Sequence, residues 1–443
     1  MTQRPARHGL RIFAVIWLGQ AVSTLGSGLT SFALGLWVYQ QTGSVTQFAL
    51  VALFATLPRI VLSPLIGPLV DRYDRRWLMI LSDSGAAACT LAVALLLASG
   101  GLELWMIFGL TALSAAFGTV QWPAYSAVTT LLVPPRHLGR ASGMVQIGGA
   151  TADILAPALA GAMLGVVGLS GVILADFATF LFAVSTLALV RFPAVEQVQE
   201  VRQARSAVWQ EALIGWRYIR SQQGLFALLM FAAVVNFLWG SVGALLPPMI
   251  LAFASPETLG VIISIAGIGM LGGGLLMSTW GGPRRRLVGI LGFELISGFC
   301  FVLMGLQPLA VLVAGAALVA HLTIAVVSGC GQAIWQTRVP PALQGRVFAF
   351  RQMIAMSSRP LAYLLAGPLA DRVFMPLLAD GGPLASSVGQ VLGAGVGRGI
   401  GLMFVIMGLI KITVVVVSSL NPALRGLDDE AVAIPAELGA LHS

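Results

Sequence analysis

The sequence predicts an all-α integral membrane protein in which twelve transmembrane helices form two six-helix bundles. Hydrophobic residues make up 58% of the 443 positions and charged residues only 9%, which is more apolar surface than a water-soluble core can bury. The apolar runs have the length of membrane helices, about 20 residues, and lack the alternation of barrel strands. A repeat between the two halves predicts a pseudo-twofold axis along the membrane normal.

Charged or Pro/Gly-rich breaks divide the apolar runs into twelve spans. Helices are the expected form because an open backbone in lipid would leave its N–H and C=O groups unsatisfied. The first run is too long, and too polar inside, for a signal peptide, so we expect it to be retained. The predicted spans are 11–38, 44–68, 77–99, 102–132, 141–165, 169–190, 225–252, 257–281, 287–305, 308–336, 347–370 and 399–420.

Basic residues are distributed unevenly among the predicted loops. Twenty of the 25 Lys and Arg fall before the first span, in the even-to-odd loops or in the C-terminal tail, whereas Arg372 and Arg398 lie on the opposite side. The positive-inside rule therefore predicts both termini in the cytoplasm. We expect a multi-pass protein of a bacterial inner membrane. The same bias accounts for the net charge of +8 without nucleic acid, whose binding would need a basic soluble face.

A repeat relates the two halves of the chain. The loops "VPPRHLGR" (133–140) and "VPPALQGR" (339–346) share the pattern VPPxxxGR at an offset of 206 residues. The same offset aligns "LAPALAG" (155–161) with "LAYLLAG" (361–367). Because six crossings bring the chain back to the side on which it started, both halves have the same orientation in the membrane.

This repeat defines the expected domains. Residues 1–190 form an N-terminal six-helix bundle, 191–222 a cytoplasmic linker, 223–420 a C-terminal six-helix bundle and 421–443 a cytoplasmic tail. The apolar residues of the linker fall near one helical face, which predicts either an interfacial amphipathic helix or a plain connecting helix.

The loop after the second span carries a charged motif, "GPLVDRYDRR" at 67–76. With Met79 it resembles the signature GxLaDrxGrkxxl of the major facilitator superfamily, with Asp74 where that family usually has glycine. The resemblance implies the fold of that family and a latch between the halves at the cytoplasmic face; the bland alternative is an ordinary positive-inside loop. The predicted gate residues are Gly67, Asp71, Arg72, Arg75 and Arg76.

Nearly the same letters return as "GPLADRVFMP" at 367–376. They follow an in-to-out span, so their charges are expected outside the cell and the motif is not a second copy of the cytoplasmic one. Asp371 and Arg372 are predicted to form an external gate or to pair with each other.

The fifth span is similar to a second signature of that family, one that belongs to exporters. Every position of this signature is a small residue or proline, which lets helices approach closely. The whole chain looks most like the macrolide-efflux and enterobactin-exporter branch, although the fourth span lacks an arginine and Ser27 stands where relatives often carry an acid. The predicted interface residues are Gly143, Ala152, Ala156, Pro157 and Gly161.

Charged side chains inside the spans are the strongest candidates for coupling because they are costly in lipid. Asp153 and Arg359, one repeat offset apart, lie with Lys411 roughly 18 Å deep at 1.5 Å per residue. Asp153 is predicted to exchange the coupling proton and Arg359 to bind an anionic group or modulate that acid; alternatively, local side chains or water satisfy each one. The predicted intramembrane charges are Asp153, Arg359, Asp176, Glu294 and Arg59, the last either a gate or a snorkelling side chain.

Polar and aromatic residues on several spans predict the substrate cavity. On the first span they recur at helical spacing along one face. Aromatic side chains with few fixed charges favour a bulky, largely apolar substrate. The predicted cavity residues are Gln20, Ser23, Thr24, Ser27, Trp122, Tyr125, Asn236, Trp239, Gln332 and Gln336.

We therefore expect a proton-coupled exporter of a drug, macrolide-like compound, siderophore or peptide-like metabolite, working by alternating access. The alternative is a transport-dead sensor or an uncoupled facilitator. The sequence lacks a GxxxxGK[ST] motif, so we expect no ATP hydrolysis. Its three cysteines form no CxxC pair and predict neither disulfides nor a metal site. We therefore expect no catalytic residues and no cofactor beyond the proton gradient. The expected partners are the small-molecule substrate and membrane lipid, with no nucleic acid, for a monomer.

Overall fold

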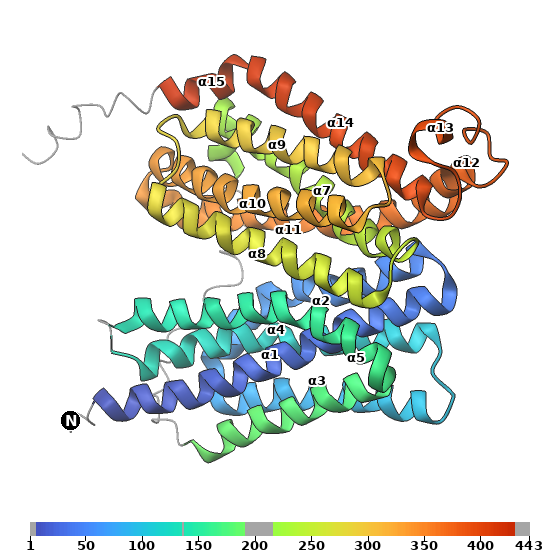
Figure 1. Cartoon of the computed structure of the whole chain (residues 1–443). Coiled ribbons are helices and arrows are strands. Elements are labelled where there is room, and N and C mark those ends of the chain that lie inside the picture. The colour runs from blue at the N-terminus through green and yellow to red at the C-terminus, as the bar shows by residue number, and fades with distance from the viewer. Residues whose placement is uncertain (1–5, 135–136, 191–215, 430–443) are drawn as a thin grey trace, which may run out of the picture. The chain divides into compact units, whose positions relative to one another are not determined.

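The computed structural model describes residues 6–134, 137–190 and 216–429. These residues form helices joined by short connections (Figure 1). In the described part, eleven helices are long and apolar enough to cross a membrane, and they separate into two compact units. The predicted all-α membrane fold is confirmed.

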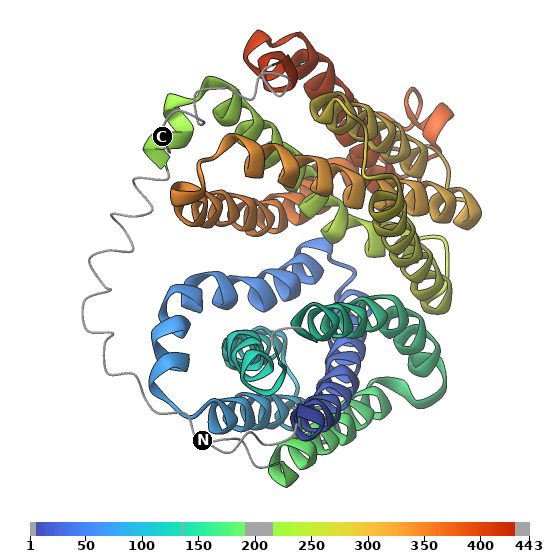
Figure 2. The same ribbon diagram turned by 90° about the vertical axis from the view of Figure 1, so that its left-hand side faces the viewer.

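Unit 1 consists of Met1–Arg202, Ala244–Gly267 and Tyr363–Val373. Its complete helices lie side by side in both views (Figures 1 and 2). The longest of them, α5, covers two of the predicted spans and breaks at Gly168, whose φ of 66° favours glycine. These helices are α1 Ala6–Thr42, α2 Val45–Arg72, α3 Arg75–Ala98, α4 Leu104–Leu132 and α5 Leu138–Leu189.

Unit 2 consists of Gln203–Gly243, Ile268–Ala362 and Phe374–Ser443. The unit boundaries cut three long helices, α7 (Gln223–Leu251), α8 (Pro256–Trp280) and α11 (Pro341–Leu369). A π-helical turn at Ala370–Phe374 follows α11. The remaining helices are α9 Arg286–Leu306, α10 Ala310–Arg338, α12 Met375–Leu378, α13 Gly389–Leu392, α14 Arg398–Leu420 and α15 Pro422–Asp429.

The predicted linker and tail are described only in part. Residues 191–215 lie outside the described residues, and so do 430–443. Trp216, at the end of the linker, packs against Phe226 and Phe350 with ring centroids 5.8 and 5.2 Å away. The Asp428 carboxylate of α15 accepts hydrogen bonds from the backbone N–H groups of Leu287 and Val288, in the first turn of α9.

The turn of the charged motif ties two helices of unit 1 together. Asp74 precedes α3 and its carboxylate accepts a 2.8 Å hydrogen bond from the backbone N–H of Arg76, so aspartate caps the helix where the family usually has glycine. The Arg76 guanidinium donates to the carbonyls of Leu187 and Ala188, at 3.1 and 2.6 Å. A cation there satisfies the open carbonyls at the C-terminal end of α5.

Glycines bring α9 and α14 of unit 2 into direct backbone contact. Gly305 faces Gly401, and Gly298 faces Gly408, along one crossing. A Cβ atom on Gly408 would lie 2.6 Å from Val302 Cγ2 and 2.7 Å from the Gly298 carbonyl oxygen. Small residues allow this approach, which supplies dispersion contacts where lipid offers no hydrophobic driving force between helices.

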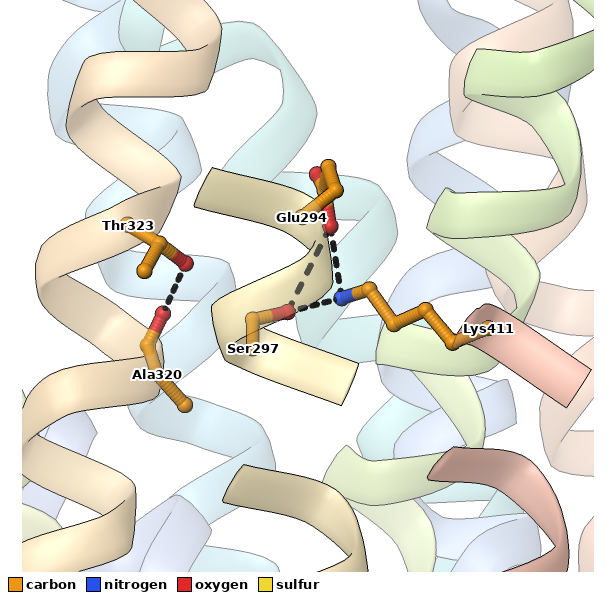
Figure 3. A network of polar contacts seen from close by, with 5 residues as sticks. All are labelled: Glu294, Ser297, Ala320, Thr323 and Lys411. Carbon is orange, nitrogen blue, oxygen red and sulfur yellow. Dashed lines mark hydrogen bonds and ion pairs between the residues drawn. The ribbon is translucent and has the colours of Figure 1, made fainter. Parts of the chain in front are cut away.

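A buried ion pair lies at the same crossing (Figure 3). Lys411 Nζ on α14 lies 2.7 Å from Glu294 Oε2 on α9, and the two side chains are 0% and 4% exposed. The ammonium also donates to the Ser297 hydroxyl and lies 4.8 and 4.5 Å from the ring centroids of Trp239 and Phe301. Carboxylate, hydroxyl and aromatic faces together satisfy a cation that lipid could not solvate.

Widening the glycine crossing should destabilise unit 2. We expect Gly408→Ala to lower the free energy of unfolding by about 1–3 kcal/mol, because the new methyl group overlaps Val302 and the Gly298 carbonyl. The matched control is Gly292→Ala on α9, where no heavy atom lies within 4 Å of the added Cβ and the change should be neutral or stabilising. Thermal unfolding in detergent measures both; equal melting temperatures would contradict the account.

Removing one member of the ion pair should cost more than removing both. Lys411→Met leaves the Glu294 carboxylate buried without its cation, so we expect a loss of about 3–5 kcal/mol. The double variant Lys411→Met/Glu294→Leu removes both charges and should recover most of that loss. Unfolding of wild type, Lys411→Met and the double variant in one detergent provides the comparison. A double variant no more stable than Lys411→Met would show that Glu294 and Lys411 do not stabilise each other as an ion pair.

Candidate functional site

Unit 1 encloses a cavity of about 430 Å³ between α1 to α5 and the segment 244–267. Most of its wall is apolar, and the charged residues among those lining it are Arg59 and Asp153. We refer to it as the large cavity only to distinguish it from a smaller pocket beside it. A mostly apolar wall with a few polar groups suits an amphipathic ligand, since the apolar area binds and the polar groups orient. The hydroxyl-bearing residues on the wall are Thr24, Thr30, Ser31, Thr56, Thr90, Thr111 and Ser114.

Small residues of α5 allow its backbone to lie close to α1 and α8 around this cavity. A Cβ on Gly28 of α1 would lie 2.8 Å from the Cβ of Ala156. A Cβ on Gly161 would lie 2.6 Å from the Pro256 carbonyl oxygen, and one on Gly260 would overlap the Pro157 carbonyl. Of the predicted interface residues, Ala152, Ala156 and Pro157 also line the cavity. Gly143 differs, because no heavy atom lies within 4 Å of a Cβ built there.

The two charged residues of the large cavity sit on open parts of its wall. Asp153 on α5 and Arg59 on α2 are both exposed. Arg359, predicted as the symmetric counterpart of Asp153, is exposed too, but it belongs to unit 2. Asp153 is therefore available to whatever occupies the large cavity.

A second, smaller cavity of about 70 Å³ borders the first, and we call it the Asp176 pocket. The two share Thr30, Ser31, Thr90 and Ser114 as wall residues. Asp176 on α5 is 5% exposed and lies in this pocket with Ser27. Ser27, at the position where the family resemblance suggests an acid, therefore lies beside an acid from another helix. The remaining wall residues are Ala86, Ala87, Phe177 and Phe180.

Asp83 on α3 is a buried acid that the sequence interpretation missed. It is 8% exposed, and its Oδ2 accepts a 3.0 Å hydrogen bond from Gln20 Nε2 on α1. The Gln20 Oε1 in turn accepts one of 2.6 Å from Gln121 on α4. These bonds join three helices away from both cavities. Asp83 could have been identified from the sequence as an acid inside the predicted span 77–99.

The other predicted cavity residues of unit 1 are distributed differently. Thr24 lines the large cavity and Ser27 the Asp176 pocket. Ser23 is buried, Tyr125 is buried in a hydrophobic cluster and Trp122 is 60% exposed, and none of these three lines either cavity.

Two of the predicted cavity residues of unit 2, Trp239 and Gln332, contact other residues of that unit. Trp239 packs edge-on against Phe301 and His321, with ring centroids 4.9 and 5.1 Å away. Gln332 accepts a 2.9 Å hydrogen bond from Arg351. Asn236 is half-buried and Gln336 is exposed. Glu294 lies in the ion pair with Lys411.

Of the predicted gate residues, the structure describes two side chains. Arg75 is half-buried, and Arg76 binds the end of α5. The side chains of Gly67, Asp71 and Arg72 lie outside the described part of the chain.

Asp371, from the second charged segment, caps the start of α2 within unit 1. Its carboxylate accepts hydrogen bonds from the Ser44 hydroxyl at 2.7 Å and from the backbone N–H groups of Val45 and Thr46 at 3.0 and 2.9 Å. A Cβ on Gly367 would lie 2.6 Å from Thr46 Cα. The acid is therefore bound to open N–H donors at a helix N-terminus, an arrangement that the helix dipole favours.

The sequence relatives of this chain include efflux proteins. Macrolide efflux protein A of Streptococcus pyogenes is 31% identical over 369 residues, which cover 82% of this chain and 90% of that protein. Multidrug efflux pump Tap of Mycobacterium bovis is 27% identical over 380 residues, covering 81% and 86%. The resemblance to a macrolide-efflux branch is thereby confirmed.

Solved structures of transporters share the fold. A bacterial homologue of the human lysosomal transporter Spinster superposes with a TM-score of 0.69 at 14% identity, covering 96% of this chain and 99% of that one. A bacterial homologue of the iron transporter ferroportin gives a TM-score of 0.66 at 14% identity, covering 93% and 99%. Identities this low show the fold alone.

The model of the family described as Major Facilitator Superfamily matches residues 16–363, most of the chain. Together with the efflux relatives, this match means that the protein is a multi-pass membrane transporter and not an enzyme. The chain belongs to the Major Facilitator Superfamily.

Proposed function

We propose that the protein exports a bulky amphipathic compound by alternating access, in exchange for protons. The observation that carries this proposal is the large cavity, with an apolar wall, an exposed acid and an exposed arginine. Relatives named for macrolide and multidrug efflux support the direction of transport. In this proposal the protein is a monomer of the bacterial inner membrane, has both termini in the cytoplasm and uses neither ATP nor a cofactor.

The dimensions and chemistry of the large cavity favour one class of substrate. Its volume of about 430 Å³ lies within the range of about 300–1,000 Å³ that is usual for small-molecule sites. The wall offers hydroxyl groups for hydrogen bonding, and Arg59 is the cation among its residues. A strongly anionic siderophore would need several cations, so a macrolide-like or cationic drug fits this wall better.

Asp153 has the role of the cavity acid in this proposal. Its carboxylate attracts a cationic group of the substrate, and a proton on the same carboxyl removes that attraction. Proton and substrate therefore compete at this group, so the affinity for substrate depends on pH. Raising the proton concentration weakens substrate binding, and raising the pH strengthens it.

Transport by purified protein in liposomes tests the export proposal. With an imposed pH gradient, we expect radiolabelled erythromycin, a macrolide, or ethidium, a cationic dye, to accumulate in the direction opposite to proton flow. Empty liposomes and liposomes with a collapsed gradient serve as controls. If no compound of a broad macrolide and dye panel moves faster than in empty liposomes, the proposal is wrong.

Neutralising the cavity acid should remove the pH dependence of binding. We expect Asp153→Asn to bind the transported compound about tenfold more weakly at high pH, a loss of about 1.4 kcal/mol, and to show the same affinity at low pH. Asp153→Glu keeps the charge and should keep the pH dependence. Equilibrium binding to detergent-solubilised protein measures this, and a pH profile of Asp153→Asn that matches wild type would remove Asp153 from the mechanism.

Filling the large cavity should block transport without unfolding the protein. Ala55 on α2 lines the cavity, so Ala55→Phe places a ring where the substrate would bind. Leu81→Phe is the matched control, because Leu81 is 62% exposed and lies outside both cavity walls. We expect at least about tenfold slower uptake for Ala55→Phe and unchanged uptake for Leu81→Phe. Equal uptake by both variants would place the substrate elsewhere.

A further inference from the structure

The Asp176 pocket has the form of an ion site set behind the large cavity. The Asp176 carboxyl is 5% exposed and is surrounded by the hydroxyls of Ser27, Thr30 and Thr90. The volume of about 70 Å³ admits a small ion or water and excludes a drug-sized molecule. Four wall residues are shared with the large cavity, so whatever enters the pocket from there passes hydroxyl groups.

The charge of the carboxylate is not balanced by the pocket itself. Among the residues that line the pocket, Asp176 is the charged one. The other titratable side chains near this route, Arg59, Asp153 and Cys89, line the large cavity instead. An ionised carboxylate buried without a cation is costly, so binding a cation or a proton there is favourable.

Hydroxyl groups reach the carboxyl from two helices. Ser27 and Thr30 of α1 and Thr90 of α3 are within hydrogen-bonding reach of Asp176. Hydroxyl groups both donate and accept, so they can stabilise the ionised carboxylate and also contribute oxygen atoms to a bound cation. Helix packing maintains the arrangement, since a Cβ on Gly26 of α1 would lie 2.8 Å from Asp176 Oδ1.

We propose that Asp176, with the hydroxyls of Ser27, Thr30 and Thr90, binds the coupling ion, which is H⁺ in the export function proposed above; Na⁺ is the alternative ion that the test below distinguishes. This inference rests on the proposed export function and names the ion site that drives it. As a proton site, the carboxylate gains an O–H bond and later returns the proton to water in the large cavity. As a sodium site, carboxylate and hydroxyl oxygens replace part of the hydration shell of the ion.

The other buried acids lack this combination of features. Glu294 already has a cation, since Lys411 lies 2.7 Å away and fills the space beside it. Asp83 accepts a hydrogen bond from Gln20 and lines neither cavity, so it serves as a structural joint between helices. Asp153 lies exposed on the large cavity wall and meets the substrate directly. Asp176 combines burial, a pocket and several neighbouring hydroxyl groups.

A measurement without substrate tests the ion site itself. Infrared difference spectra of the C=O stretch of protonated carboxyl groups are recorded for the full-length protein in lipid while pH or NaCl is varied. We expect a band in wild type that Asp176→Asn lacks and that the matched control Asp83→Asn retains. A band that responds to pH alone identifies a proton site, whereas a band removed by NaCl but not by choline chloride identifies a sodium site. An identical response in wild type and Asp176→Asn would overturn the proposal.

Transport assays then test the coupling. In Asp176→Asn liposomes we expect erythromycin to exchange down its own gradient at a near wild-type rate, while gradient-driven accumulation falls at least about tenfold. Asp83→Asn should keep both activities. Unchanged accumulation by Asp176→Asn would overturn the coupling role. If wild type moves no compound of the panel, the export proposal fails, and the infrared result still decides the ion site.

Two further variants separate a role in the ion site from a general loss of structure. Asp176→Glu keeps the acid and should retain the carboxyl band and some gradient-driven accumulation. Thr30→Val removes one of the hydroxyls beside the carboxyl and should shift the titration of the band. Its matched control is Thr413→Val on α14, where the hydroxyl donates to the Leu409 carbonyl on an exposed face. A shift of equal size in both threonine variants would show that the Thr30 hydroxyl has no part in the site.

Discussion

The hydrocarbon core of a membrane cannot solvate charge, and the placement of polar side chains in this protein follows from that constraint. Each buried ionisable group has to be satisfied by the protein, by an ion or by water in a cavity. The two units meet this requirement differently. Unit 2 encloses a complete pair in Glu294 and Lys411, with Ser297 and two aromatic rings around the ammonium. Unit 1 surrounds two acids with neutral hydrogen-bonding groups instead.

This difference separates structural charges from working ones. A paired charge is already neutralised, so it gains little free energy by binding another ion. In unit 2 the pair lies at a crossing where glycines bring α9 and α14 into backbone contact. An acid surrounded by hydroxyls can still gain or lose a cation, and in unit 1 such an acid borders the large cavity. The backbone contacts around that cavity also depend on small residues, here of α1, α5 and α8.

Much of the fold could be predicted from the sequence, because hydropathy and length determine membrane spans. The break of α5 at Gly168 falls in the gap left between the predicted spans 141–165 and 169–190. Asp74 illustrates a limit: the sequence shows an aspartate where the family usually has glycine, and the structure shows that its carboxylate caps α3. Efflux was predicted through resemblance, which the relatives support.

The candidate site was harder to predict, because depth in the membrane says nothing about partners. Counting residues placed Asp153 and Lys411 at similar depth, yet one lies exposed on a cavity wall and the other is fully buried in an ion pair. Ser27 suggested a lost acid until α5 placed Asp176 in the same pocket. Asp371 had two predicted roles, and the capping of α2 depends on a contact between residues 327 positions apart.

The most direct test of this division is the transport activity of a protein whose paired charges have been removed. The double variant Lys411→Met/Glu294→Leu, reconstituted in liposomes, should drive erythromycin accumulation at close to the wild-type rate, because a satisfied pair contributes to packing and not to coupling. A double variant that is stably folded and moves erythromycin only down its own gradient would contradict the account and place the coupling charge in unit 2.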